Sequence, residues 1–327
     1  MTNLPNEVIR LENVTKDFTV RTGMFSKGKK NRAIDKVNLT VLKGEILGVV
    51  GESGSGKTTL GMILLGMTSI NSGKIYFEGK EISTLDRHTI REFRLRSQMI
   101  FQDPFESLNP MLTVSEAVNT PLIVEKGEID RLERHEKIVK ALSNAGLQPA
   151  EEFLMKIPSE LSGGQRQRVG IARALINNPS FVVADEPVSM LDVSIRADIL
   201  NLLKDQTKSR SMSMIFISHD IAITRYIADR IVVMHLGQIV EQGSSTDIVD
   251  NAKHPYTVLL LRSMPELSDK NLVPVDEQIE YNVDTMNTGE NECSFVSKCP
   301  FAMEECSKRR PEMKEIDPGH FVACYLF

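Results

Sequence analysis

Short apolar runs alternate with stretches of helical periodicity over the first 240 residues of the chain. Residues 45–50, 181–184 and 214–217 are short runs rich in β-branched or aromatic side chains, which is typical of buried strands. Residues 57–67 follow the first run after a glycine-rich turn and predict a helix. Residues 195–203 place apolar side chains at helical spacing between the other two runs. The alternation predicts an α/β fold with a largely buried sheet.

The later part of the chain departs from this alternation. Residues 113–145 carry no strand signal and predict a helical insertion, whereas residues 230–241 contain two β runs around Leu236-Gly237 and predict a hairpin. Beyond residue 253 the composition becomes polar and acidic. We therefore expect one large domain over residues 1–253, with a helical subdomain at about 103–168, and a small C-terminal domain over residues 254–327.

The composition is that of an ordinary soluble chain. It is 41% hydrophobic and 25% charged, which excludes disorder as the main state. No apolar run reaches the roughly eighteen residues that a membrane-spanning helix needs. The start of the chain lacks the basic and then apolar pattern of a secretory signal, so we expect a cytosolic protein.

The charge is slightly acidic and unevenly distributed. Acidic side chains outnumber basic ones by 44 to 39, which argues against a nucleic-acid partner because such proteins usually carry a basic surface. Residues 265–327 hold thirteen acidic and six basic side chains, and they also hold all four cysteines of the chain. In a cytosolic protein a local cysteine cluster favours metal binding over disulfides.

A glycine-rich motif lies between the first predicted strand and its helix. Residues 51–58 read Gly-Glu-Ser-Gly-Ser-Gly-Lys-Thr and fit the phosphate-loop pattern in the context that the pattern requires, which makes a chance glycine-rich turn improbable. Its backbone N–H groups and the helix N-terminus would hold phosphates, Lys57 would neutralise them, and the Thr58 hydroxyl would face Mg²⁺. The expected ATP contacts here are Gly51, Ser53, Gly54, Ser55, Gly56, Lys57, Thr58 and Thr59.

Two acidic residues follow the second predicted strand. Asp185 would lie where it can hold the Mg²⁺ water shell, and Glu186 where it can polarise an attacking water. Two acids at the end of a strand are usually only a solvated strand end. Together with the phosphate loop, they favour a nucleotide-hydrolysing site.

The segment between these two motifs resembles a known family. Leu161-Ser162-Gly163-Gly164-Gln165 looks like the signature of ABC transporter ATPases, and it leads into a helical run. The resemblance implies a P-loop ABC cassette, with a RecA-like core, an antiparallel β subdomain and a helical subdomain. It also implies that two such subunits close head to tail, so that the signature of one meets the ATP held by the other.

The same resemblance extends to single residues elsewhere in the chain. Phe18 matches the aromatic that stacks on adenine, Gln102 the glutamine that touches Mg²⁺ and the attacking water, and His219 the histidine that contacts the γ-phosphate. The resemblance thus implies catalytic roles for Lys57, Gln102, Glu186 and His219. Ser189, Leu191 and Asp192 match the loop that communicates across the dimer.

Three segments narrow the resemblance to one group of importers. Residues 101–110, 185–194 and 254–257 look like the ATPase subunits of oligopeptide, dipeptide and nickel importers, closest to the second of the two subunits that these systems pair. The implied activity is ATP hydrolysis coupled to peptide import, with nickel or oligosaccharides as alternative solutes. The implied partners are two transmembrane permease subunits, a second ABC ATPase subunit and, indirectly, an extracytoplasmic solute-binding protein. The implied location is peripheral, on the cytoplasmic face of the inner membrane.

A soluble ABC ATPase that acts on DNA or ribosomes is the alternative from another class. Such proteins usually insert a long coiled coil or a zinc module, or fuse two cassettes, and none of these features is present in the sequence.

The four cysteines are separated by five, six and seventeen residues, which is not the Cys-x-x-Cys spacing of common zinc sites. Thiolates suit both zinc and iron–sulfur clusters, and buried free thiols are a third possibility. The resemblance favours a [4Fe–4S] cluster on Cys293, Cys299, Cys306 and Cys324, with zinc as the alternative. We expect a structural role, such that loss of a cysteine leaves the nucleotide affinity of the core nearly unchanged.

Overall fold

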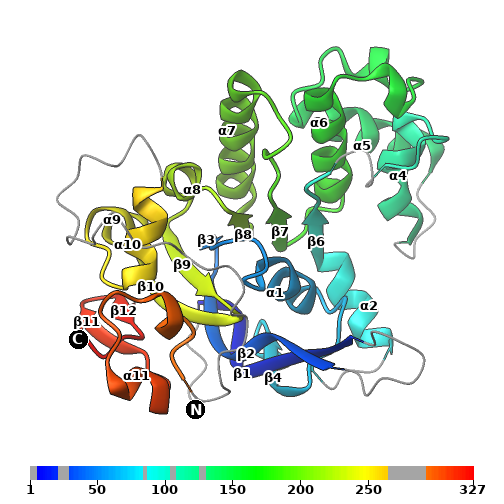
Figure 1. Cartoon of the computed structure of the whole chain (residues 1–327). Coiled ribbons are helices and arrows are strands. Elements are labelled where there is room, and N and C mark those ends of the chain that lie inside the picture. The colour runs from blue at the N-terminus through cyan, green and yellow to red at the C-terminus, as the bar shows by residue number, and fades with distance from the viewer. Residues whose placement is uncertain (1–5, 21–28, 84–86, 104–107, 125–129, 264–291) are drawn as a thin grey trace.

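The computed structural model describes residues 6–20, 29–83, 87–103, 108–124, 130–263 and 292–327 (Figure 1). Two sheets and the helices around them form the layers of the fold. Parts of three ranges used in the sequence predictions lie outside the described residues, namely 104–107 within 101–110, 125–129 within 113–145, and 264–291 within the C-terminal part. Among the described helices, none is long and apolar enough to cross a membrane.

The main sheet has eight strands in the order β11-β12-β10-β9-β3-β8-β7-β6. Their bounds are Ile46–Val50 (β3), Ser97–Ile100 (β6), Phe181–Asp185 (β7), Ser213–Ser218 (β8), Arg230–His235 (β9), Gln238–Ser244 (β10), Lys314–Asp317 (β11) and His320–Val322 (β12). The strands from β6 to β9 are parallel, and β10, β11 and β12 continue the sheet in antiparallel pairs. The predicted buried strands are therefore confirmed as β3, β7 and β8.

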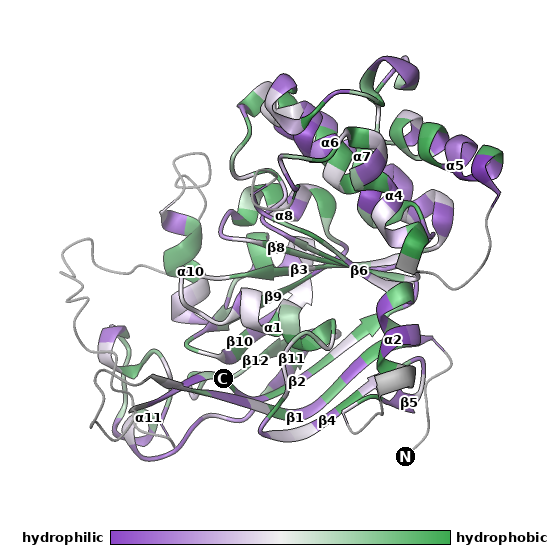
Figure 2. Ribbon diagram, turned by 90° about the vertical axis from the view of Figure 1, so that its right-hand side faces the viewer, coloured by the Kyte–Doolittle hydropathy of each residue, from purple (hydrophilic) through white to green (hydrophobic). Residues whose placement is uncertain are grey.

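A smaller antiparallel sheet has the order β2-β1-β4-β5. Its strands are Glu7–Val20 (β1), Lys29–Leu42 (β2), Ser72–Phe77 (β4) and Lys80–Glu81 (β5). Helix α1, Lys57–Leu64, lies between the two sheets (Figure 2). Side chains of β3 alternate between two cores, with Leu47 and Val49 facing α1 and the small sheet, and Ile46 and Val50 facing the other side.

Helix α1 is shorter than the sequence predicts, because Gly66 ends it. Gly66 adopts a left-handed φ of 61°, its N–H donates to Ile63 O, and the Met67 N–H donates to Met62 O. This pair of bonds is a Schellman motif, which satisfies the last carbonyls of a helix and stops it. The predicted hairpin at Leu236-Gly237 is confirmed between β9 and β10, with both turn residues at positive φ.

The other helices cover the main sheet and build the helical part of the molecule. They are Arg87–Arg96 (α2), Val114–Val124 (α4), Arg131–Asn144 (α5), Gly163–Leu175 (α6), Val193–Arg210 (α7), Ile221–Ile227 (α8), Ser245–Asp250 (α9), Pro255–Arg262 (α10) and Glu304–Lys308 (α11). Short 3₁₀ turns cover Ala150–Phe153, Pro158–Glu160 and Val296–Lys298. The region of the predicted helical insertion contains α4 and α5, which pack with α6 around a separate apolar core.

The C-terminal residues 292–327, which we term the cysteine segment, pack on the edge of the main sheet (Figure 1). Strand β12 pairs with β10 and extends the sheet. Beneath this pairing His320 Nε2 lies 2.8 Å from a carboxylate oxygen of Glu241, and both side chains are fully buried. The same carboxylate accepts the backbone N–H groups of Lys253 and His254.

Candidate functional site

The loop of residues 51–56 joins β3 to α1, and its glycines are required by close approaches. A Cβ on Gly51, at φ 155°, would lie 2.2 Å from Met234 O, and one on Gly56, at φ 101°, would lie 2.4 Å from Ala33 O. Neither position admits another residue without moving backbone. The glycines therefore let the loop pack tightly against the β9–β10 turn and the small sheet.

Lys57, in the first turn of α1, is buried and holds the loop closed. Its Nζ donates to Gly51 O at 2.7 Å and to Glu52 O at 2.8 Å. Burial lowers the pKa of the Lys57 ammonium, and the carboxylates of Glu186, Asp185 and Glu52 oppose that shift. The result is a cation at the mouth of a backbone cradle, which is a site for an anionic group.

Asp185, at the end of β7, meets Thr58 of the loop. Burial raises the pKa of Asp185, while a hydrogen bond from the Thr58 hydroxyl and the charge of Lys57 lower it. Its Oδ1 is buried, and no hydrogen-bond partner lies near it among the described residues. A buried carboxylate oxygen without a partner beside a threonine hydroxyl fits a hard divalent cation such as Mg²⁺.

Glu186 is held in an unusual backbone conformation directly after β7. Its φ is 45°, a left-handed value that costs a residue with a side chain on the order of 1 kcal/mol. One carboxylate oxygen, Oε2, accepts a hydrogen bond from Gln102 Nε2 at 3.2 Å and lies 3.1 Å from His219 Nδ1. Three residues far apart in the sequence thus converge next to the loop. The arrangement can orient a water and accept its proton.

The predicted signature opens α6. Ser162 is the N-cap, its Oγ accepts the Gln165 N–H at 3.3 Å, and Gln165 Oε1 accepts the Ser162 N–H at 2.9 Å. This reciprocal pair is a capping box, so the segment begins a helix as the sequence predicts. Leu161 is buried, and a Cβ on Gly164 would meet Ile195 of α7 at 2.9 Å.

Comparison with known proteins gives two matching family profiles and several similar proteins. The ABC transporter family profile matches residues 34–189, and the profile of the oligopeptide/dipeptide transporter C-terminal region matches residues 240–306. The oligopeptide transport ATP-binding protein AppF of Bacillus subtilis is 40% identical over 98% of this chain and 97% of its own length. This chain belongs to the ABC transporter ATPase family. A putative peptide import ATP-binding protein of Brucella ovis is 42% identical over 90% of this chain and 91% of its own length.

Solved structures show the same ABC cassette fold. The ATP-binding cassette MJ0796, in a dimeric post-hydrolysis state bound to ADP and Pi, has a TM-score of 0.65 and 32% identity, covering 72% of this chain and 98% of that one. The cbiO1 protein of Clostridium perfringens, part of the transporter complex cbiONQ, has a TM-score of 0.65 and 25% identity over 80% of this chain and 96% of that one. The predicted cassette fold and ATPase activity are therefore confirmed.

The remaining predicted positions of the ABC site lie in the loop and in the segments around it. Phe18, in β1, is 37% exposed, and the Lys16 ammonium lies over its ring, 5.0 Å from the ring centre. Ser189 Oγ donates to Glu186 O at 3.0 Å. Leu191 is buried near Gly163 of the signature. The other predicted positions are Ser53 and Gly54 in the loop, Ser55 with a buried hydroxyl, Thr59 in α1 and Asp192 as the N-cap of α7.

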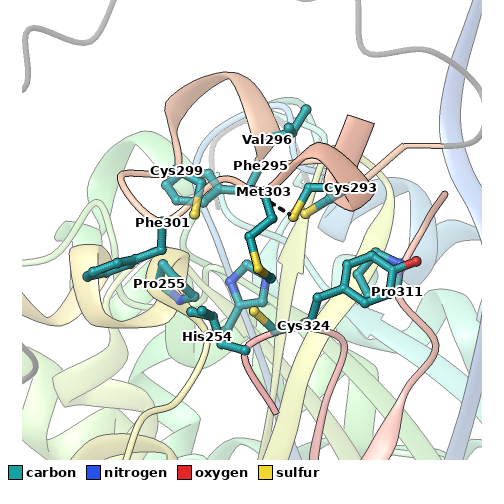
Figure 3. Close-up of a pocket in the computed structure, with 13 residues that line it drawn as sticks. His254, Pro255, Cys293, Phe295, Val296, Cys299, Phe301, Met303, Pro311 and Cys324 are labelled. Atoms are coloured by element: carbon teal, nitrogen blue, oxygen red, sulfur yellow. Dashed lines mark hydrogen bonds between the residues drawn. The ribbon is translucent and has the colours of Figure 1, made fainter. Parts of the chain in front are cut away.

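The four cysteines of the C-terminal part line one pocket (Figure 3). Backbone N–H groups donate to the sulfurs of Cys293, Cys299 and Cys324, and the Met303 N–H donates to that of Cys306 at 3.5 Å. Burial raises the pKa of Cys293 to about 11 and that of Cys299 and Cys324 above the ordinary value. Within the described ranges, no three His, Cys, Asp or Glu side chains are grouped so that they could hold a metal ion.

Two residues of the C-terminal part, Tyr256 and Arg310, contact the cassette domain and have no role in the sequence predictions. The Tyr256 hydroxyl accepts the Glu52 N–H at 2.9 Å, and Arg310 donates to the backbone and side-chain oxygens of Asp35 at 3.1 Å. A tyrosine in an apolar helix is a signal for a buried hydroxyl that needs a partner, but the sequence does not say which.

Proposed function

We propose that this chain is the ATP-hydrolysing subunit of an ABC importer for peptides, located at the cytoplasmic face of the cell membrane. The observation that carries the proposal is the convergence of Gln102 and His219 on one oxygen of Glu186, beside the loop that Lys57 closes. The similarity to oligopeptide and peptide import ATP-binding proteins over nearly the whole chain supports the transported class.

Hydrolysis is an in-line attack of water on the γ-phosphate of ATP. Glu186 orients the water and accepts its proton, Lys57 neutralises phosphate charge, and His219 donates to the γ-phosphate. Asp185, Thr58 and Gln102 would hold Mg²⁺, which supplies charge neutralisation on the transferred group when bound. Loop residues 51–58 bind the phosphates, and Phe18 stacks on the adenine.

The site is completed by partners. The signature segment of a second ABC ATPase subunit covers the ATP held by this chain, and Leu161–Gln165 of this chain covers the ATP held by that subunit. Ser189, Leu191 and Asp192 transmit closure across the dimer. Two permease subunits receive that movement near Gln102, and an extracytoplasmic solute-binding protein delivers the solute to them. Phe101, which precedes Gln102 in the sequence, and Met111 have exposed apolar side chains, which supports a docking surface in this part of the chain.

Transport by the purified, reconstituted complex tests the function. Proteoliposomes that hold the two permeases and both ATPase subunits, with the solute-binding protein on the side opposite the ATPase subunits, should take up a labelled oligopeptide. Uptake should require ATP on the side of the membrane where this chain lies. Lys57→Ala in this chain should abolish uptake. Uptake of Ni²⁺ or an oligosaccharide without uptake of peptide would show that the proposed solute class is wrong. ATP turnover that is unaffected by the permeases would favour the soluble alternative.

We further propose that residues 254–327 form a C-terminal domain whose Cys293, Cys299, Cys306 and Cys324 hold a [4Fe–4S] cluster. The support is that all four line one pocket and that each sulfur receives a backbone N–H, the kind of hydrogen bond that tunes cluster thiolates. A single zinc ion would need four sulfurs at about 2.3 Å from one point. A cluster instead takes one thiolate at each of its irons, so its ligands stand further apart.

Anaerobic purification of the full chain tests the cluster. The protein should be brown, absorb broadly near 400 nm and contain roughly four irons per chain. Cys299→Ser should lower the iron content, whereas Ser297→Ala in the same loop should not. A colourless protein with one zinc would favour the zinc alternative, and a metal-free protein with four titratable thiols would contradict both.

A further inference from the structure

Tyr256, in α10, connects the C-terminal part of the chain to the phosphate loop. Its side chain is fully buried, and its hydroxyl accepts the backbone N–H of Glu52 at 2.9 Å, across 204 residues of sequence. Glu52 is the second residue of the loop, where the chain leaves β3. The loop is thus hydrogen-bonded from outside at the point where it begins.

Two other contacts hold the loop, and neither can replace this one. Lys57 Nζ donates to the carbonyls of Gly51 and Glu52, and the Gly237 N–H donates to Ser55 O at 2.9 Å. Both contacts fix carbonyl oxygens. Within the loop, the Ser55 N–H donates to Glu52 O at 3.2 Å. Among the contacts that other described segments make to the loop, the Tyr256 contact is the one that fixes an amide, and the amides of this loop are the groups that bind phosphate. The bond from the Glu52 N–H to Tyr256 fixes the peptide plane at the start of the loop, and with it the position from which the following residues reach the phosphates.

The ring of Tyr256 is itself held by an aromatic cluster that reaches the cysteine pocket. Its centre lies 4.4 Å from that of His235 and 5.4 Å from that of Phe295. Phe295 lies between Cys293 and Cys299 in sequence, is 2% exposed and lines the pocket. Burial lowers the pKa of His235 to about 4, so the cluster is uncharged at neutral pH. It therefore acts by packing rather than by charge.

We propose that Tyr256 is a positioning residue for ATP binding, acting through the Glu52 amide, and that Phe295 couples the cysteine segment to the phosphate loop. The proposal rests on the role of residues 51–58 as the phosphate site. It predicts that damage to the cysteine segment weakens ATP binding, in contrast to the expectation from sequence that the two parts are independent.

The test is ATP affinity of the purified full chain carrying Tyr256→Phe, which removes the hydroxyl and keeps the ring. Loss of one neutral hydrogen bond should raise the Kd for Mg-ATP about three- to tenfold. In the assembled transporter, KM should rise with kcat nearly unchanged, because the loop binds ground state and transition state alike. The matched control is Tyr226→Phe, which removes a hydroxyl that donates to Asn201 outside the loop and should leave the Kd unchanged.

Lys57→Ala separates this proposal from the one on which it rests. Wild-type ATP affinity in Lys57→Ala would contradict the phosphate site itself. Lost affinity in Lys57→Ala together with wild-type affinity in Tyr256→Phe would overturn only the role of Tyr256.

A second variant and a second measurement cover the case in which Tyr256→Phe does not fold. Phe295→Leu keeps the hydroxyl but removes the ring that packs on Tyr256. It should raise the Kd about twofold to fivefold and speed hydrogen exchange in the peptide that contains Glu52. Unchanged exchange and unchanged Kd in a folded Phe295→Leu protein would overturn the coupling.

Discussion

The phosphate loop and the cysteine pocket both bury acidic groups, but the two sites offset that burial differently. At Asp185 burial raises the carboxyl pKa, and the Thr58 hydroxyl and the Lys57 ammonium lower it again. At Cys293 burial raises the thiol pKa to about 11, and Arg310 is the cation that opposes the shift. Arg310 also pairs with Asp35, so its charge is shared.

This difference in how burial is offset indicates whether each site is formed before or after its ligand binds. The loop is closed by its own glycines, by Lys57 and by backbone contacts, so it is built before any ligand binds. In the cysteine pocket, burial raises the pKa of the Cys293, Cys299 and Cys324 thiols, and metal binding would have to release their protons against that shift. We therefore expect the cassette site to be stable without ligands and the cysteine segment to gain stability when the proposed metal group binds.

The largest stability effect should come from breaking the closed loop. Gly56→Ala adds a Cβ only 2.4 Å from Ala33 O at a left-handed φ, and should cost about 3 kcal/mol or more of unfolding free energy. Gly54 also has positive φ, but nothing lies within 4 Å of its added Cβ, so Gly54→Ala should cost only about 1–2 kcal/mol. Urea unfolding without nucleotide measures both. Equal losses would show that packing against Ala33 does not shape the loop.

The next effect concerns the attachment of the cysteine segment. His320→Ala removes the side-chain partner of the fully buried Glu241 carboxylate, which keeps its two backbone N–H donors, and should cost about 3 kcal/mol. Faster hydrogen exchange in β12 and β10 should accompany the loss, because these strands pair at that point. The exposed His135 in α5 provides the control, and His135→Ala should change stability by less than about 0.5 kcal/mol. A His320→Ala protein as stable as this control would contradict the attachment.

A smaller effect of opposite sign is expected at Asp185. Its pKa is raised in the folded chain, so the ionised carboxylate costs stability above that pKa. Asp185→Asn should therefore raise the Tm of the nucleotide-free protein at pH 7.5 by a few degrees, the shift that about 1 kcal/mol produces. The gain should shrink as the pH falls through the raised pKa of Asp185, because the wild-type carboxyl is then protonated too. A lower Tm for Asp185→Asn would show that its pairing with Lys57 outweighs its burial.

Much of the predicted cassette site rests on local sequence constraints, whereas the convergence of Gln102 and His219 on Glu186 depends on the fold. Eight consecutive residues define the phosphate loop, and Asp185 and Glu186 are placed by the strand that precedes them. The structure adds two details to these predicted elements: the left-handed φ of Glu186 and the end of α1 before Gly66.

The contacts of the C-terminal part could not be predicted in this way, because they depend on packing between distant segments. The Tyr256–Glu52 bond spans 204 residues, and the Arg310–Asp35 contact spans 275. No motif in the sequence predicts β11 and β12. They extend the main sheet because β12 pairs with the edge of β10.

The claim that Glu186 is the general base of an ABC ATPase is tested most directly by ATP turnover of the Glu186→Gln variant in the assembled transporter. The amide keeps the shape of the side chain but cannot accept a proton from water. Turnover should fall by two or more orders of magnitude, while the Kd for ATP stays within about threefold. The control Glu133→Gln changes an exposed carboxylate of α5 and should leave turnover unchanged. Wild-type turnover in Glu186→Gln would contradict the claim.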